Sequence, residues 1–248
     1  MSIKCPFDYY KRESIADPGM QKDVMRYSPG NILFSGVRGR NDTHLIIQTT
    51  IQYLAFLDDP EKSKYLLTLR NPTDRLISYL FHAHKQKWIY RNVVTSNFNA
   101  TLVHTIVISL LEKVKTCLLK NGELACVYMY NSRDGNLDPV IQHGMYVVYI
   151  EELFKFIPRE RIYINQLEEY SLDQLQMAGK MVEFFGRKLD ITEETIASSY
   201  KSRNKGTKTG VLPETLSKLD KFYRPYNQRL ATLLGDKKWL YNRKAKQS

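Results

Sequence analysis

The stretch KYLLTLRNPTDRLISYL, residues 64–80, joins two unlike segments. Its opening KYLLTL is a short apolar run, which is typical of a buried parallel strand. Asn71 can cap a helix that begins at Pro72, because a proline at the first helical position loses no backbone hydrogen bond. The stretch therefore predicts a strand, a tight turn that carries Arg70, and a helix with Ser78 about two turns from its start.

Other segments continue this alternation of strand and helix. The sequence predicts short strands at residues 31–34 and 161–165 and a loop at 200–210. Helices are predicted at 43–57, 99–119 and 213–234. Three more helices are predicted by one end only: one starts at 138, another ends at 186, and a short one starts at 192. Ser171 and Gln174 are expected to form a capping box, and Pro225 is expected to interrupt the last helix. Strands that alternate with helices indicate an α/β fold with a small, mostly parallel sheet.

Charge is distributed unevenly along the 248 residues, whose formal net charge is +11. Residues 201–248 contain thirteen Lys or Arg against three Asp or Glu. This basic end indicates either a polyanionic partner or a solvated basic face. No nucleic-acid motif accompanies the charge, so nucleic acid is not the expected partner. No signal peptide or membrane span is expected either, since the most apolar run, residues 101–111, is well short of the roughly 20 residues that a span needs.

Arg70 is the first residue after a predicted parallel strand, where ligands of α/β sheets bind. The helix behind it presents a positive dipole end, which favours anions. Arg75 lies three residues before Ser78 on nearly the same helix face. An arginine fork with a hydroxyl suits a phosphate monoester. The alternative is structural: Arg70 pairs with a carboxylate, and Ser78 is only tolerated on the helix surface.

The three cysteines are too few for a disulfide scaffold, and none lies in a zinc-type pair. Cys117 and Cys126 flank an Asn-Gly turn that can bring the two thiols together. Two buried free cysteines are the other possibility. Asn41 and Asn99 each begin a glycosylation sequon.

Four stretches together carry a resemblance: LLTLRNPTDRLISYL, CLLKNGELACVY, HGMYVVYIEELFKFIPRERIYINQLEEY and FYRPYNQRLATLLG. In this order they resemble motifs of the Golgi carbohydrate sulfotransferases, which use 3′-phosphoadenosine 5′-phosphosulfate (PAPS). They are most similar to the enzymes that sulfate N-acetylgalactosamine 4-sulfate at O6. The resemblance implies that Arg70 and Ser78 hold the 3′-phosphate of PAPS, and that Cys117 and Cys126 form a disulfide.

The resemblance also implies a basic loop that closes over the cofactor. The stretch KSRNKGTKTG occupies its place, with Arg203, Lys205 and Gly206 as candidate ligands. Cationic side chains and a glycine that lets backbone N–H groups approach an oxyanion suit this role. No metal is implied.

The implied fold is the P-loop-like sulfotransferase fold, with the sulfotransferase domain at residues 61–242. Residues 1–60 are expected to be irregular and diverged, and residues 243–248 to form a basic tail. The implied activity is transfer of a sulfuryl group to a hydroxyl of a glycosaminoglycan, at O6 of N-acetylgalactosamine in chondroitin or dermatan sulfate. The implied location is the Golgi, whose lumen makes the sequons at Asn41 and Asn99 usable.

One family feature has no counterpart. The family's phosphate loop, P-K-x-G-[ST]-[ST], is not found, and the Gly- and Arg-rich residues 32–43 do not match it. The expectation is therefore a chain that lacks the N-terminal part of the domain and the membrane anchor. His82, His84 and Glu168 can titrate, but no spacing identifies one of them as the catalytic base. The alternative function is a catalytically impaired, truncated homologue that binds nucleotide or sulfated glycan.

Overall fold

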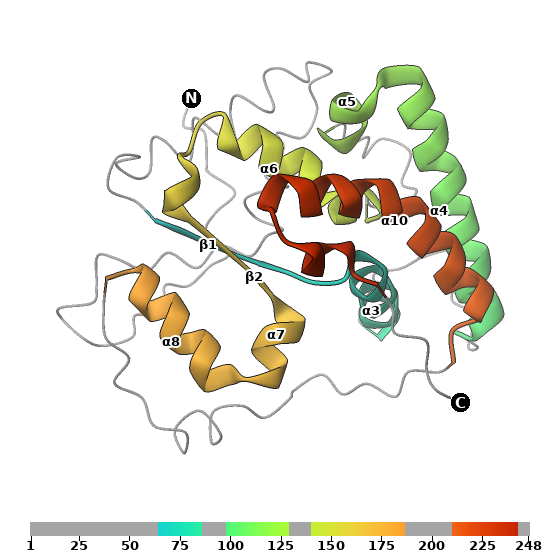
Figure 1. Cartoon of the computed structure of the whole chain (residues 1–248). Coiled ribbons are helices and arrows are strands. Elements are labelled where there is room, and N and C mark those ends of the chain that lie inside the picture. Colours follow the sequence, from blue (N-terminus) through green and yellow to red (C-terminus); the bar gives the residue numbers. More distant parts are fainter. Residues whose placement is uncertain (1–63, 86–97, 129–139, 187–209, 243–248) are drawn as a thin grey trace, which may run out of the picture.

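The computed structural model describes residues 64–85, 98–128, 140–186 and 210–242, which are coloured in Figure 1. The predictions for other segments lie outside the described residues. They are the irregular segment 1–60 with its strand at 31–34 and helix at 43–57, the helix from 192, most of the loop 200–210, and the tail 243–248.

Two parallel strands form the sheet of the described chain. β1 (Tyr65–Leu69) pairs with β2 (Ile162–Gln166), and Leu69 lies opposite Gln166 at the end of the register. Both strands were predicted within a residue of these bounds. Because the strands are parallel, their carboxyl ends meet at one edge of the sheet, which we call the carboxyl edge. Figure 1 shows the strands crossing the middle of the molecule, with helices around them.

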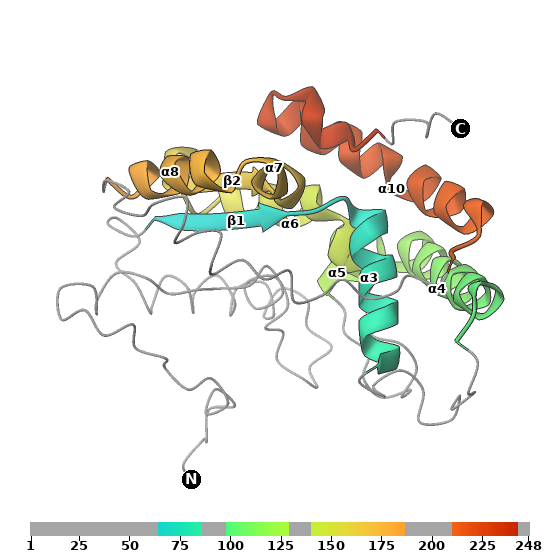
Figure 2. The same cartoon turned by 90° about the horizontal axis from the view of Figure 1, so that it is seen from below.

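The segment after β1 folds as the sequence predicts. Helix α3 (Pro72–Lys85) begins directly after the turn. The Asn71 side-chain oxygen caps it by accepting hydrogen bonds from the N–H groups of Thr73 at 3.0 Å and Asp74 at 3.2 Å. In Figure 2, α3 turns sharply away from the end of β1.

Two helices then form a corner. Helix α4 (Ala100–Asn121) is capped by Asn99, and helix α5 (Glu123–Tyr128) follows it. Gly122 joins them with φ 77°, a conformation that side chains with a Cβ rarely adopt.

The region before β2 differs from the prediction. The helix expected from Asp138 is α6 (Tyr146–Phe154), and a 3₁₀ turn, η2 (Gln142–Gly144), precedes it. The helix cannot start earlier because residue 145 at its N-cap has φ −83° and ψ 55°, outside the helical region. A second 3₁₀ turn, η3 (Arg159–Arg161), leads into β2.

After β2 come α7 (Leu167–Leu172) and α8 (Gln174–Phe184). The predicted capping box of Ser171 and Gln174 is wrong. Ser171 lies inside α7, and Asp173 caps α8 by accepting from the N–H of Gln176 at 2.9 Å. The short helix α7 therefore includes Ser171, which was expected to cap the helix that ends at 186.

The C-terminal helix α10 (Pro213–Leu234) is continuous, so the predicted interruption at Pro225 is wrong. Pro225 lies on the exposed side, as does Lys221 one turn earlier, so the carbonyl deprived of its N–H partner can reach solvent. The helix ends at Leu234, and Gly235 caps it with φ 69°. The chain then forms the 3₁₀ turn η4 (Lys237–Leu240).

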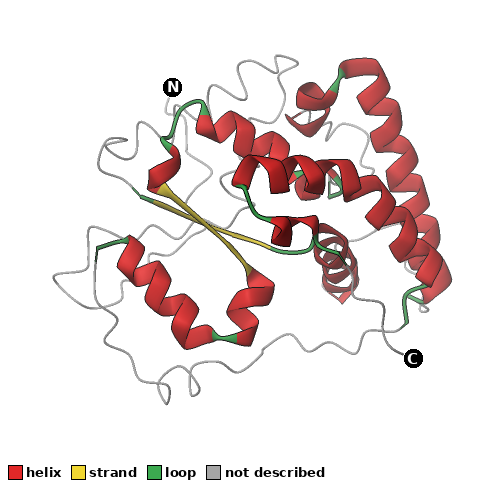
Figure 3. Ribbon diagram, in the orientation of Figure 1, coloured by secondary structure: helices red, strands yellow, loops and turns green. Residues whose placement is uncertain are grey.

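Helix α10 organises the core of the described chain. It contacts α3, α4, α6 and η4, and its fully buried Leu219 and Tyr223 join Leu76 of α3 and Tyr149 of α6 in one hydrophobic cluster. Figure 3 shows how helices make up most of the described chain and surround the strands. Among the described helices, none is both long enough and apolar enough to span a membrane.

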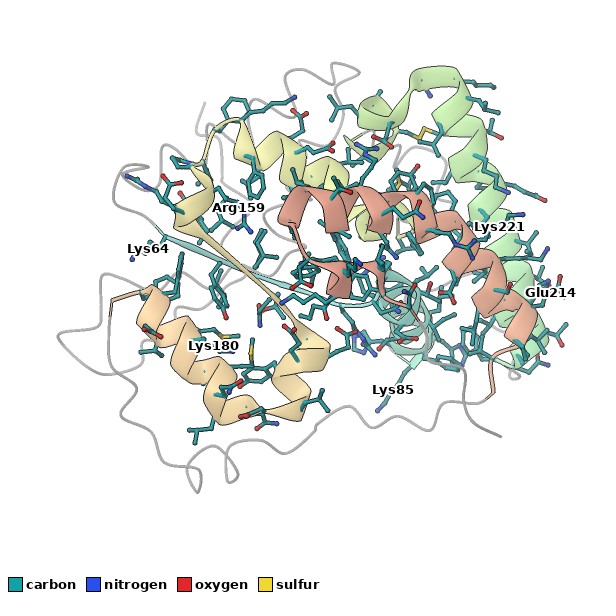
Figure 4. All side chains as sticks on the ribbon, viewed as in Figure 1. Lys64, Lys85, Arg159, Lys180, Glu214 and Lys221 are labelled. Atoms are coloured by element: carbon teal, nitrogen blue, oxygen red, sulfur yellow. A yellow bond between two sulfur atoms is a disulfide. The ribbon has the colours of Figure 1, made fainter. Side chains whose placement is uncertain are left out.

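The basic residues on the outer side of α10 face solvent. Lys221, labelled in Figure 4, and Arg224 are exposed. Lys218 forms an exposed pair with Glu214 one turn earlier, with 3.3 Å between Nζ and Oε1. Such exposed pairs contribute little to stability.

Candidate anion-binding site at the carboxyl edge

Arg70 lies where β1 ends and is half-buried. Ser78 is half-buried on α3, two turns further on. Within the described ranges, no hydrogen bond or ion pair joins the side chain of either residue to another residue. The structural alternative, in which Arg70 pairs with a carboxylate, therefore has no support from the described residues. Among the described residues, none uses the donors of these two side chains.

The start of α3 is not the open anion site that the dipole argument predicts. The Asn71 N–H donates to Oε1 of Glu168 at 2.8 Å, and Pro72 has no N–H. The next two N–H groups donate to the Asn71 side chain. The exposed donors of the first turn are thus already used, and a carboxylate lies at the helix tip. The tip of α3 therefore offers no free backbone donor to a further anion.

Glu168 reaches this position from the first turn of α7, which follows the neighbouring strand. It is the second residue after β2, so it lies at the same carboxyl edge as Arg70. Its other oxygen, Oε2, is buried without a hydrogen-bond partner in the described part of the chain. Sequence reasoning identified Glu168 only as a titratable residue, because its partner lies 97 positions away.

Arg75 does not join Ser78 in a phosphate fork, so that expectation is wrong. Its guanidinium is directed into the fold, where Nη2 donates to the Val140 carbonyl and Nε is buried. Together with burial, its charge holds the pKa of His143 well below the usual value. Arg75 therefore ties α3 to the segment before η2 and is no candidate ligand for an external anion.

Two tyrosines surround the base of the Arg70 turn. The Tyr223 hydroxyl donates to the Ile141 carbonyl at 2.9 Å. The Tyr146 hydroxyl has a hydrogen bond with the backbone of Arg70. Burial raises the pKa of Tyr146, although the positive charge of Arg75 and this hydrogen bond act in the opposite direction. Both hydroxyls therefore stay protonated at neutral pH.

Gly144 is the point at which three of the sequence motifs meet. A Cβ on Gly144 would lie 2.7 Å from Tyr223 Cε1 and 2.9 Å from Pro72 Cβ, closer than side-chain carbons approach. The glycine in HGMY thus lets η2 come close to both the tyrosine in FYRPYN and the proline in LRNPT. The sequence signal for this contact was that the three residues lie in the motifs, since neither Gly144 nor Pro72 has a reactive side chain.

The segment after α10 covers the same edge. The Asn71 amide donates to the Tyr241 carbonyl at 3.4 Å, and the Gln166 amide donates to the Lys238 carbonyl at 3.0 Å. Lys238 Nζ also lies 3.1 Å from the Glu169 carboxylate. The turn that carries Arg70 is therefore held from β2, from α6 and from the C-terminal segment.

The other site candidates are spread over the chain. Cys117 and Cys126 form a disulfide, with Cα atoms 5.7 Å apart, between α4 and α5. Asn99 is exposed, and its side-chain oxygen accepts from the Leu102 N–H at 2.9 Å. The candidates Asn41, Arg203, Lys205 and Gly206 lie outside the described residues.

Neither histidine of α3 lies near Arg70. His82 and His84 are in the last turn of the helix, opposite its Arg70 end, and the His84 ring stacks on Phe98 with 4.2 Å between ring centroids. Where side chains are described, no group of three or more His, Cys, Asp or Glu could hold a metal ion.

Comparisons with known proteins agree on one family. A family model described as a sulfotransferase domain matches residues 37–226. Carbohydrate sulfotransferase 15 of Rattus norvegicus is 30% identical over 183 residues, which cover 71% of this chain and 30% of that protein. Carbohydrate sulfotransferase 15 of Nototodarus sloanii is 30% identical over 157 residues, which cover 57% of this chain and 95% of that protein.

A solved structure agrees on the fold. A sulfotransferase from Alicyclobacillus acidocaldarius superposes with a TM-score of 0.51 at 18% identity, over 77% of this chain and 62% of that one. It confirms the α/β sulfotransferase fold expected from the sequence. This chain spans about 30% of the length of the mammalian relatives it matches. The match over residues 37–226 nevertheless covers most of the chain, which therefore belongs to the sulfotransferase family.

Proposed function

We propose that this chain provides the 3′-phosphate-binding part of a PAPS-dependent carbohydrate sulfotransferase. The observation that carries the proposal is the Arg70 side chain at the carboxyl edge, which has no partner among the described residues. A half-buried guanidinium that pairs with no carboxylate of the described residues can take a ligand anion as its partner.

The surroundings of Arg70 fit a phosphate monoester. Arg70 offers a planar fork of donors, and the Ser78 hydroxyl adds a donor further along α3. The helix tip is closed by Glu168, so the phosphate oxygens meet side-chain donors on the flank. PAPS supplies the sulfuryl group for transfer when it is bound.

The acceptor is proposed to be a glycosaminoglycan, with O6 of N-acetylgalactosamine in chondroitin or dermatan sulfate as its target hydroxyl. Support comes from the relatives named carbohydrate sulfotransferase and from the exposed basic residues of α10. Arg203, Lys205 and Gly206 are proposed to close over the cofactor. The disulfide suits an oxidising compartment, which supports a Golgi location and glycosylation at Asn41 and Asn99.

A second candidate is nucleotide binding without transfer. It is favoured by the missing P-K-x-G-[ST]-[ST] loop and by the use of Glu168 in a structural hydrogen bond. Sulfuryl transfer needs stabilisation of the leaving phosphate and a base for the acceptor proton, and no described residue is placed for either task. Binding and transfer therefore have to be measured separately.

Calorimetric binding of adenosine 3′,5′-bisphosphate tests the proposed 3′-phosphate site of Arg70 and Ser78, which we call the clamp. Arg70→Ala is expected to weaken binding by about 10- to 100-fold, the value of a hydrogen bond to a charged group, and Ser78→Ala by several-fold. Arg224→Ala, which removes an exposed arginine from α10, is the matched control and should leave affinity unchanged. Equal affinity of the wild type and Arg70→Ala would refute the clamp.

Transfer of ³⁵S from labelled PAPS to chondroitin sulfate separates the two candidates. The chain as printed is expected to transfer very little, because it has no P-K-x-G-[ST]-[ST] loop for the 5′-phosphosulfate. Robust transfer would show that other residues take over the role of that loop and would remove the binding-only alternative.

A further inference from the structure

The main chain of the Arg70 turn is held by residues that do not face the proposed ligand. The Asn71 N–H donates to Glu168 Oε1 at 2.8 Å, and the backbone of Arg70 has a hydrogen bond with the Tyr146 hydroxyl. These two contacts fix consecutive peptide groups. One comes from Glu168 in the first turn of α7, directly after β2, and the other from the first residue of α6.

The carboxylate of Glu168 is a costly way to cap a helix. Asn71 already caps α3, and Oε2 of Glu168 is buried without a hydrogen-bond partner in the described ranges. A buried, unsatisfied carboxylate oxygen lowers stability, and such exceptions occur mainly where function requires them. Stability alone therefore does not account for Glu168 at this position.

Arg70 also needs external support. Within the described ranges, its side chain has no hydrogen bond or ion pair that would fix its direction. Its aim therefore depends on the backbone from which it projects. An error of about 1 Å in a binding group is enough to lose much of its contribution.

We propose that Glu168 and Tyr146 are positioning residues that hold the Arg70–Asn71 main chain and so aim the Arg70 guanidinium at a 3′-phosphate. The inference rests on the proposed nucleotide-binding function. Glu168 acts as a hydrogen-bond acceptor for Asn71, and its negative charge is not required. Tyr146 acts through its hydroxyl, and neither residue touches the phosphate.

Two pairs of variants test this role. Glu168→Gln keeps an acceptor for the Asn71 N–H, whereas Glu168→Leu has a similar size and no acceptor. Tyr146→Phe removes the hydroxyl beside Arg70. Tyr149→Phe removes another buried hydroxyl of α6, the one that lies 3.5 Å from the Val127 carbonyl, and is the matched control.

Each variant is titrated with adenosine 3′,5′-bisphosphate and with adenosine 5′-monophosphate, which lacks the 3′-phosphate. Glu168→Leu is expected to weaken binding of the bisphosphate about tenfold and that of the monophosphate less than about threefold, because only the 3′-phosphate meets Arg70. Glu168→Gln should restore bisphosphate affinity. Tyr146→Phe should weaken bisphosphate binding several-fold, and Tyr149→Phe should not.

Three results would overturn the proposal. One is that both Glu168→Leu and Tyr146→Phe keep the wild-type ratio of affinities for the bisphosphate and the monophosphate. Another is failure of Glu168→Gln to restore binding. The third is an equal loss for both nucleotides, which marks a general loss of structure. If Glu168→Leu does not fold, the Tyr146→Phe and Tyr149→Phe pair decides alone. If Arg70→Ala instead binds the bisphosphate as tightly as the wild type does, the clamp itself is refuted. Failure of the positioning role and failure of the proposed function are therefore distinguishable.

Discussion

Replacing Gly144 by alanine tests whether the contact between three motifs supports the Arg70 turn. The added Cβ would lie 2.7 Å from Cε1 and 2.8 Å from Cζ of Tyr223, and 2.9 Å from Cβ of Pro72. Carbon atoms reach their optimal separation at about 3.5–4.0 Å, so the neighbours have to move by about 1 Å. Tyr223 is fully buried and its hydroxyl is bonded to the Ile141 carbonyl, so it cannot simply swing away.

The expected cost follows from overpacking in a core. Adding a methyl group to a well-packed site lowers the free energy of unfolding by about 1–3 kcal/mol. For a chain of 248 residues this corresponds to a fall in Tm of roughly 2–6 °C. Because the displaced Pro72 follows directly after the Arg70–Asn71 turn, affinity for adenosine 3′,5′-bisphosphate should fall as well.

Differential scanning calorimetry and denaturant titration measure the effect. Gly210→Ala is the control, since a Cβ there meets nothing within 4 Å. In a Tyr223→Leu background, Gly144→Ala should cost less than in the wild type, because the smaller side chain leaves room for the methyl group. The reasoning fails if Gly144→Ala melts within about 1 °C of the Gly210→Ala control, which would mean that the site yields without strain.

Three further predictions concern stability and modification. Replacing Cys117 and Cys126 by serine should lower the free energy of unfolding by about 2–3 kcal/mol in denaturant titration, because their bridge closes a loop with a sequence separation of 9; an unchanged midpoint would contradict this. Burial raises the pKa of Tyr226 to about 12, above 10.0 for the ordinary side chain, so this hydroxyl stays protonated in the folded state after the unfolded chain ionises. Its contribution to stability should be complete below pH 10.0 and decline as the pH rises through about 12, and Tyr226→Phe should flatten that decline in unfolding curves. In secretory expression, Thr101→Ala should abolish glycosidase-sensitive mass on the Asn99 peptide without shifting Tm, since the cap at Asn99 remains; persistent mass on that peptide would refute the assignment.

The local features of the β1–α3 segment were predictable because their causes are local. The apolar run, the Asn71 cap and the first-turn Pro72 act within a few residues of one another, and the structure confirms each.

Local patterns failed where a neighbour far along the chain decides the outcome. Pro225 was expected to break α10, but the solvent-facing side of the helix tolerates it. Arg75 was expected beside Ser78 on helical spacing alone, but the Val140 carbonyl draws its guanidinium inward. The helix tip was expected to be open, but Glu168 at the start of α7 closes it. Helical periodicity carries no information about any of these partners.

The contact between Asn71 and Tyr241 sets a time during synthesis before which the Arg70 turn lacks one of its supports. The two residues are 170 positions apart. A ribosome that adds roughly 5–20 residues per second needs about 10–30 s to pass from one to the other. During that interval Glu168, Tyr223 and η4 are added in this order, so the Arg70 turn is made long before the residues that hold it. On the proposed function, the Arg70 site is therefore completed only after Tyr241 has been added. A chain that terminates within α10 lacks the contact of Asn71 with the C-terminal segment.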